Sequence, residues 1–141
     1  MISSFWSRWL IGVTLGVIGF GALLMGAAFP GLDGPTLALL TLLNGQTPQF
    51  NDTLRFSTGL MGAVTFGWGV TLFVVVRAAL ANPELGARLW RPLTLGLVAW
   101  FIPDCIISVS TGFALNIVTN LVVLTAWIIP LQACGLLRRQ A

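Results

Sequence analysis

Histidine is absent from this sequence, and cysteine occurs only twice in 141 residues. Because histidine is the commonest protein ligand of transition metals and haem, its absence predicts a chain with no metal site and no cofactor. Cys105 and Cys134 lie 7 residues before and 22 residues after Gly112, the centre of a predicted helical hairpin. Their depths in that hairpin therefore differ by roughly 22 Å. This separation excludes an intramolecular disulfide, and the sequence contains no paired-cysteine redox motif.

Charged residues are also scarce, at 8% of the chain, whereas 57% of the residues are hydrophobic. The chain has the length of one domain, and a soluble domain of this size cannot bury that much apolar surface. Four segments approach the roughly 20 apolar residues needed to cross a hydrocarbon layer of about 30 Å. The sequence therefore predicts an all-α integral membrane protein, a single four-helix bundle over residues 1–141 with spans at about 9–29, 59–80, 93–110 and 113–131.

The seven basic residues are all arginine, and six of them lie on the same side of the predicted spans. Arg55 alone lies on the other side. Because basic residues favour cytoplasmic loops, both termini are predicted to be cytoplasmic (N-in/C-in) and the long first loop to face outward. We interpret the arginines as topology determinants, so the expected partner is the lipid bilayer and not nucleic acid. The six are Arg8, Arg77, Arg88, Arg91, Arg138 and Arg139.

Polar residues inside the last two spans are arranged symmetrically about Gly112. Asp104 and Asn120 are each eight residues from this glycine, and Ser108 and Asn116 are each four residues from it. In an antiparallel helix pair, Asp104 should therefore meet Asn120 roughly 12 Å below the turn, and Ser108 should meet Asn116 nearer the surface. These four residues form the predicted polar cluster.

Asp104 is the only acidic residue embedded in a long apolar segment, where a charged carboxylate costs at least about 2.5–3.5 kcal/mol. We expect it to be either protonated and hydrogen-bonded to Asn120, or ionised and paired with Arg55. Pro103 should bend the helix immediately before Asp104. Two interpretations of the cluster stay open: a structural lock between helices, or a functional site.

Glycines recur along one stripe of each of the first two spans. Small residues on one helix face let another helix approach closely, so the stripes predict a contact between these two spans. A contact between two copies of the chain would produce the same pattern. The predicted packing glycines are Gly12, Gly16, Gly19, Gly59, Gly62 and Gly69.

The N-terminal segment carries Phe5, Trp6 and Trp9, residues typical of the aromatic belt at a membrane interface. A cleaved signal peptide is the competing interpretation, with Gly26 and Ala28 before the cleavage site. The apolar run is longer than the 7–15 residues typical of a signal core, so we favour a retained first span.

The loop after the first span, about 25 residues, is long for a compact bundle. Asp33-Gly34-Pro35 suits a helix start, and Asn44-Gly45 suits its end. We therefore predict a short interfacial helix over Thr36–Leu43, acting either as a lid or as a hydrophobic plug on the bundle. Asn51-Asp52-Thr53 matches a glycosylation acceptor, but we interpret it as the cap of the next helix.

The inner loop between the second and third spans, residues 77–91, is predicted to contain a helix end, a turn and a restart. Pro83 and Pro92 both suit the first turn of a helix.

The combined pattern resembles a known group of proteins. It comprises Arg55-x3-Gly59-x2-Gly62-x4-Gly67-Trp68-Gly69, followed by Trp100-x3-Asp104-x3-Ser108-x3-Gly112-x3-Asn116-x3-Asn120. From the second span onward it is similar to small, uncharacterised four-span bacterial inner-membrane proteins, and more distantly to DoxX-like membrane proteins. The resemblance implies a multi-pass protein of the bacterial inner membrane and assigns no activity to these residues.

Three function hypotheses follow from these patterns. The first is a non-enzymatic structural or accessory protein, working as a homo-oligomer or within a larger membrane complex. The second is a carrier or a bundle that binds a small molecule or lipid at the polar cluster. The third, a lipid-directed enzyme with Asp104 as general base, ranks last because no nucleophile–base pair or metal-ligand set accompanies the carboxylate.

Overall fold

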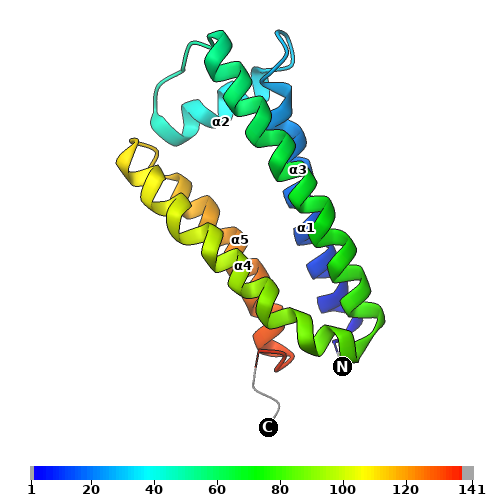
Figure 1. Ribbon diagram of the computed structural model, residues 1–141. Coiled ribbons are helices and arrows are strands. Elements are labelled where there is room, and N and C mark those ends of the chain that lie inside the picture. The colour runs from blue at the N-terminus through cyan, green and yellow to red at the C-terminus, as the bar shows by residue number, and fades with distance from the viewer. Residues whose placement is uncertain (1, 138–141) are drawn as a thin grey trace. The chain divides into compact units, whose positions relative to one another are not determined.

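The computed structural model describes residues 2–137, and within them every regular element is a helix, without a strand. Arg138 and Arg139, which contribute to the predicted topology, lie outside the described residues. Four of the helices are long and apolar enough to cross a membrane, with mean hydropathies between 1.5 and 2.0. This finding confirms the all-α class and the number of candidate spans. In chain order the helices are α1 (Ser4–Gly26), α2 (Gly34–Asn44), α3 (Asp52–Ala81), α4 (Pro83–Ser110) and α5 (Asn116–Ala133) (Figure 1).

The contacts of the chain gather into two compact units, and each is described by itself. One unit comprises residues 14–72, and the other comprises residues 1–13 and 73–141. Since α1 and α3 each continue from one unit into the other, their two ends belong to different units.

In the unit of residues 14–72, α1 and α3 pack antiparallel with almost no side-chain layer between them. Gly21 lies against the backbone of Phe66, and Gly62 lies against the backbone of Met25. The residue numbers of each pair add up to 87, which is the register of the helix pair. A Cβ atom at either glycine would collide with the opposite backbone, so the contact requires residues without side chains.

The glycines predicted on the first span do not make this contact. Among the described residues, no heavy atom lies within 4 Å of a Cβ built on Gly12, Gly16 or Gly19. At about 100° per residue, these three positions lie roughly 140–180° around the helix from Gly21. The glycine stripe of α1 therefore faces away from the side that meets α3, and Gly21 makes the close contact instead. On α3, by contrast, Gly59, Gly62 and Gly69 all lie close to atoms of the chain between Ile18 and Ala28.

Helix α2 forms within the first long loop and is tied to α1 by one buried hydroxyl. Thr36 is fully buried and donates to the carbonyl of Leu23 over 2.9 Å. Gly45 ends the helix in the left-handed conformation, with φ of 73°, and its N–H donates to Thr41. Leu42, which is 71% exposed, leaves an apolar surface on this short helix.

Helix α3 begins with the cap expected from the sequence. The side-chain oxygen of Asn51 accepts a hydrogen bond from the backbone N–H of Leu54 over 2.8 Å. The helix starts at Asp52, seven residues before the predicted span. Arg55 consequently lies in the first turn of α3.

In the other unit, α4 begins ten residues earlier than the predicted third span. Asn82 caps it by accepting hydrogen bonds from the N–H groups of Glu84 and Leu85, and Pro83 follows at the first helical position. The prediction for Pro83 is therefore confirmed, but the first-turn prediction for Pro92 is wrong. Pro92 lies inside α4, as Pro103 does, and Figure 1 shows α4 bending in its first third.

Two tryptophans join α4 to α5 at the end of the hairpin away from its turn. Trp90 and Trp127 are each 1% exposed, and their rings meet edge to face with centroids 6.3 Å apart. The Trp127 Nε1–H donates to the hydroxyl of Thr94 over 2.9 Å. The Nε1–H of Trp9, in α1, donates to the carbonyl of Ala126 over 2.8 Å. This hydrogen bond connects the start of α1 to α5.

Candidate functional site

The polar cluster lies in the hairpin of α4 and α5, whose geometry depends on the turn at Gly112. This glycine has φ of 84°, a left-handed conformation that favours glycine. The next N–H, of Phe113, donates back to the carbonyl of Ser108 over 2.8 Å. Residues 113–115 are not helical, so α5 begins at Asn116, three residues after the predicted start.

Both contacts predicted from the spacing about Gly112 are present. Asn120 donates from Nδ2 to Oδ1 of Asp104 over 2.7 Å. Asn116 donates from Nδ2 to the hydroxyl of Ser108 over 3.0 Å and to the same Oδ1 over 2.8 Å. The structure thus brings Asp104, Ser108, Asn116 and Asn120 together, with side chains from both helices converging on one carboxyl oxygen.

The hydrogen-bond donors of the cluster are fully used inside the hairpin. Each asparagine amide has two protons. Those of Asn116 serve Asp104 and Ser108, while those of Asn120 serve Asp104 and the sulfur of Cys105, at 3.5 Å. The Ser108 hydroxyl has one proton and lies 2.7 Å from the Asp104 backbone carbonyl but 3.3 Å from Oδ1, so the carbonyl is its better acceptor.

The two oxygens of the Asp104 carboxyl group have different surroundings. Oδ1 receives one amide N–H group from Asn116 and one from Asn120, and neither of these two bonds reaches Oδ2. This arrangement suits an ionised carboxylate, and it equally suits a protonated acid whose carbonyl is Oδ1 and whose proton is on Oδ2. Asn120 and Ser108 are buried, with 3% and 5% exposure, while Asp104 is half-buried.

Arg55 pairs with a different carboxylate from the one predicted. Its Nη2 lies 2.8 Å from Oδ2 of Asp33, and its Nη1 donates to the carbonyl of Ala27 over 3.1 Å. The guanidinium also lies over the ring of Phe50, 5.1 Å from its centroid. Within its own unit Arg55 is thus engaged by Asp33, because α3 begins early enough to place Arg55 beside the loop that carries Asp33. The ion pair between Arg55 and Asp104, which would join the two units, stays a prediction.

The Arg55 hydrogen bond holds the pKa of Asp33 below the ordinary value of 3.8. Asp33 also precedes α2 without capping it through its side chain, since its carboxylate is engaged by Arg55. The sequence predicted Asp33 only as a helix-start residue, and nothing in its local pattern indicates the pairing with Arg55.

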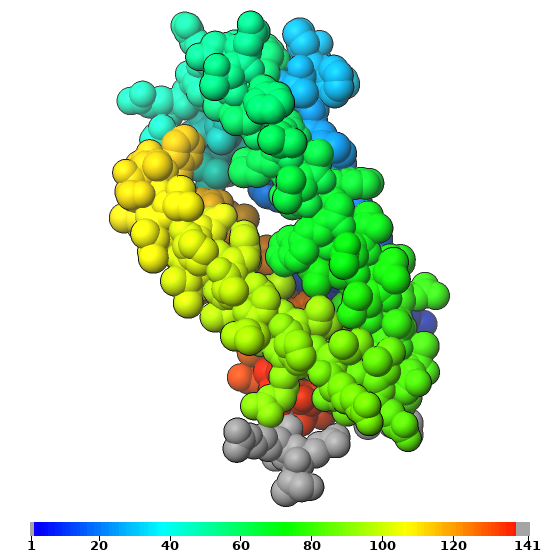
Figure 2. Space-filling model, in the orientation of Figure 1, coloured from blue at the N-terminus to red at the C-terminus, as the bar shows by residue number. Residues whose placement is uncertain are grey.

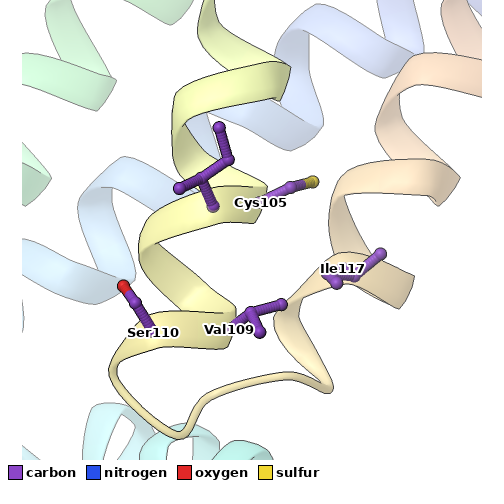
Figure 3. Close-up of a pocket in the computed structure, with 5 residues that line it drawn as sticks. Cys105, Val109, Ser110 and Ile117 are labelled. Atoms are coloured by element: carbon purple, nitrogen blue, oxygen red, sulfur yellow. The ribbon is translucent and has the colours of Figure 1, made fainter.

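An open, mostly apolar groove lies beside the polar cluster near the turn of the hairpin (Figure 3). The side chains of Cys105 and Val109 point toward α5, and Ser110 is directed away from it. Through its contact with Asn120, Cys105 borders both the groove and the cluster. The groove is lined by Cys105, Ile106, Val109, Ser110 and Ile117.

The chemistry around Asp104 is that of amides, a hydroxyl and a thiol. Within residues 2–137, no three side chains of the metal-binding types His, Cys, Asp and Glu gather in one place. The Ser108 hydroxyl is hydrogen-bonded to Asp104 and Asn116 in the part of the chain that the structure describes. The cluster can join helices, and it can present one carboxyl oxygen to a donor or a proton.

No protein-family model, no curated protein and no solved structure matches this chain. The resemblance to small four-span membrane proteins and to DoxX-like proteins therefore stays a prediction from the sequence.

Proposed function

We propose that this chain is a small multi-pass protein of the bacterial inner membrane with a non-enzymatic, structural or accessory role. The observation that carries the proposal is the convergence of Asn116 and Asn120, from α5, on one oxygen of Asp104, from α4. Every amide proton of the cluster is used inside the hairpin. Such a network sets the register of two helices, and the hydroxyl beside the carboxyl group, that of Ser108, already donates to the backbone carbonyl of Asp104.

The proposed topology places both termini in the cytoplasm and α2 at the outer membrane interface. The support is the six arginines on one side, together with an α2 that is apolar but, at 11 residues, too short to span. Exposed leucine on α2 suits the boundary between headgroups and acyl chains.

The proposed partner is a second copy of the chain or another membrane protein, in contact with the stripe of Gly12, Gly16 and Gly19. The support is the orientation of this stripe, away from the helix side that meets α3, where an added Cβ would touch no described residue. Gly16→Leu tests this part, because it fills the stripe and leaves the α1–α3 contact intact. We expect it to weaken self-association or co-purification of partners; an unchanged oligomeric state and partner set would refute the role of the stripe.

The Asp104→Asn variant separates a structural lock from a functional carboxyl group. Asparagine keeps a carbonyl oxygen where Oδ1 accepts from Asn116 and Asn120, and it replaces only Oδ2. A structural lock therefore predicts a folded protein that behaves like the wild type. Loss of a cellular function or of a partner in a folded Asp104→Asn protein would contradict the lock as the whole role of Asp104.

A carrier or ligand-binding bundle is the second candidate, supported by a half-buried carboxyl group on which both amides of α5 meet Oδ1 and not Oδ2. An intramembrane carboxyl group suits proton loading or a cationic ligand. In liposomes with an imposed pH gradient, this candidate predicts proton flux that Asp104→Asn abolishes and Thr125→Val preserves. Thr125 is a matched control, since its hydroxyl bonds only within α5. Flux equal to that of empty liposomes would remove this candidate in its proton-coupled form.

A further inference from the structure

One exposed face of α4 combines two arginines with an apolar stripe that continues from them. Arg88 and Arg91 are three residues apart and are both exposed. The same face continues through four exposed residues at steps of three and four, namely Leu95, Ala99, Ile102 and Ile106. Figure 2 shows α4, coloured from light green to yellow, on the surface of the viewed face.

The two arginines lack acidic partners in the described chain. The ion pair of residues 2–137 joins Arg55 to Asp33, so neither Arg88 nor Arg91 is neutralised. Glu84 lies one turn before Arg88 without forming an ion pair with it. The start of α4 therefore presents two uncompensated positive charges.

The position of Arg88 and Arg91 along the length of α4 suits the headgroup layer of a membrane. Helix α4 has 28 residues and is roughly 42 Å long, whereas the hydrocarbon core is about 30 Å thick. We take Ser110, the last residue of α4, as the opposite boundary of the hydrocarbon core. A count of about 20 residues back along the helix then places Arg91 at the near boundary and Arg88 about 4 Å outside it. From Leu95 to Ile106 the stripe then runs roughly 16 Å into the membrane, about the length of one leaflet.

We infer that this face of α4 binds an anionic phospholipid, with its phosphate at Arg88 and Arg91 and an acyl chain along Leu95, Ala99 and Ile102. Guanidinium groups bind phosphate oxygens in a fixed fork, and clustered basic residues at a membrane surface attract anionic lipids. A zwitterionic lipid carries no net charge to balance the pair. The inference is independent of the role of Asp104, since it uses a different part of α4.

Native mass spectrometry of the full-length protein with added phosphatidylglycerol or phosphatidylcholine tests this site. We expect wild type to retain phosphatidylglycerol preferentially. Arg88→Gln/Arg91→Gln should bind it about 30-fold more weakly, since each arginine near a membrane surface contributes roughly a factor of five. Arg8→Gln/Arg77→Gln removes the same charge from other helices and should keep the preference.

Two further variants keep the test decisive if the double glutamine variant does not fold. Arg88→Lys/Arg91→Lys retains the charge and should retain most of the binding, and Ile102→Gln should weaken it through the acyl chain alone. Equal loss in both double glutamine variants would mean attraction by bulk charge and would overturn the site. The absence of any preference in wild type would overturn it as well.

Discussion

Asn120 donates to Oδ1 of Asp104 over 2.7 Å, which joins α5 to α4 across a separation of 16 residues. The bond lies eight residues from Gly112 on each side, so the turn and the polar contact specify one register of the hairpin together. A slip of the hairpin by one helical turn in either direction would move Asn120 out of level with Asp104 and break this bond.

Removal of the acceptor should destabilise the hairpin, and removal of one donor should do so less. Asp104→Leu leaves two amides without their carboxyl partner, and we expect it to cost about 1–3 kcal/mol. Asn120→Leu breaks one interhelical bond, for which about 0.6–1.7 kcal/mol is expected in a membrane protein. Unfolding in mixed micelles measures both, with Thr125→Val as the control on α5. If Asp104→Leu were as stable as wild type, the cluster would not lock the hairpin.

The Arg55–Asp33 pair should make the outer loop sensitive to acid. The pKa of Asp33 is lowered in the folded protein, so the pair contributes stability above the unfolded value of 3.8. That stability is lost as pH falls from 3.8 through the folded pKa. In unfolding experiments from pH 7 to 2, Asp33→Asn should be less stable than wild type at neutral pH, and the difference should narrow as the pH falls below 3.8.

Arg55→Gln serves as the companion variant for this pair. It should stay below wild type even at acid pH, because the bond from Arg55 to the Ala27 carbonyl does not titrate. A constant difference between wild type and Asp33→Asn across this pH range would contradict the assignment of the acid effect to Asp33.

The close contact of α1 and α3 should reject any side chain at Gly62. A Cβ there would lie 2.7 Å from the carbonyl carbon of Leu24, so Gly62→Ala forces the helices apart. Overpacking of this kind typically costs about 1–3 kcal/mol. Gly67→Ala is the matched control, since it adds the same methyl group to the same helix where no described atom lies within 4 Å. Equal thermal stability of the two variants would argue against the α1–α3 register.

The proposed topology predicts opposite labelling of two exposed positions. In a background with Cys105 and Cys134 replaced by alanine, Gln46→Cys should react with a membrane-impermeant maleimide added to intact cells. Glu84→Cys, in the first turn of α4, should react only after the membrane is opened. The reverse pattern would show that the arginine distribution does not set the orientation of this protein.

The sequence by itself determined the features that depend on local length and symmetry. Runs of apolar residues long enough to cross a bilayer specify four spans, because few other structures can use such segments. The contacts of Asp104 with Asn120 and of Ser108 with Asn116 also follow from the sequence, since one short turn links the two helices and Gly112 marks its centre. Within a hairpin, residue spacing and depth are almost the same quantity.

Only the tertiary structure decided the relationships between segments joined by long connections. Asp33 is the partner of Arg55 because of the path of a long loop and the early start of α3, neither of which shows in local spacing. Gly21 meets α3, and Gly16 does not, because the register of an antiparallel pair chooses one face of each helix. Several registers bury glycine equally well in a sequence so rich in it, and the choice among them depends on the packing of whole helices.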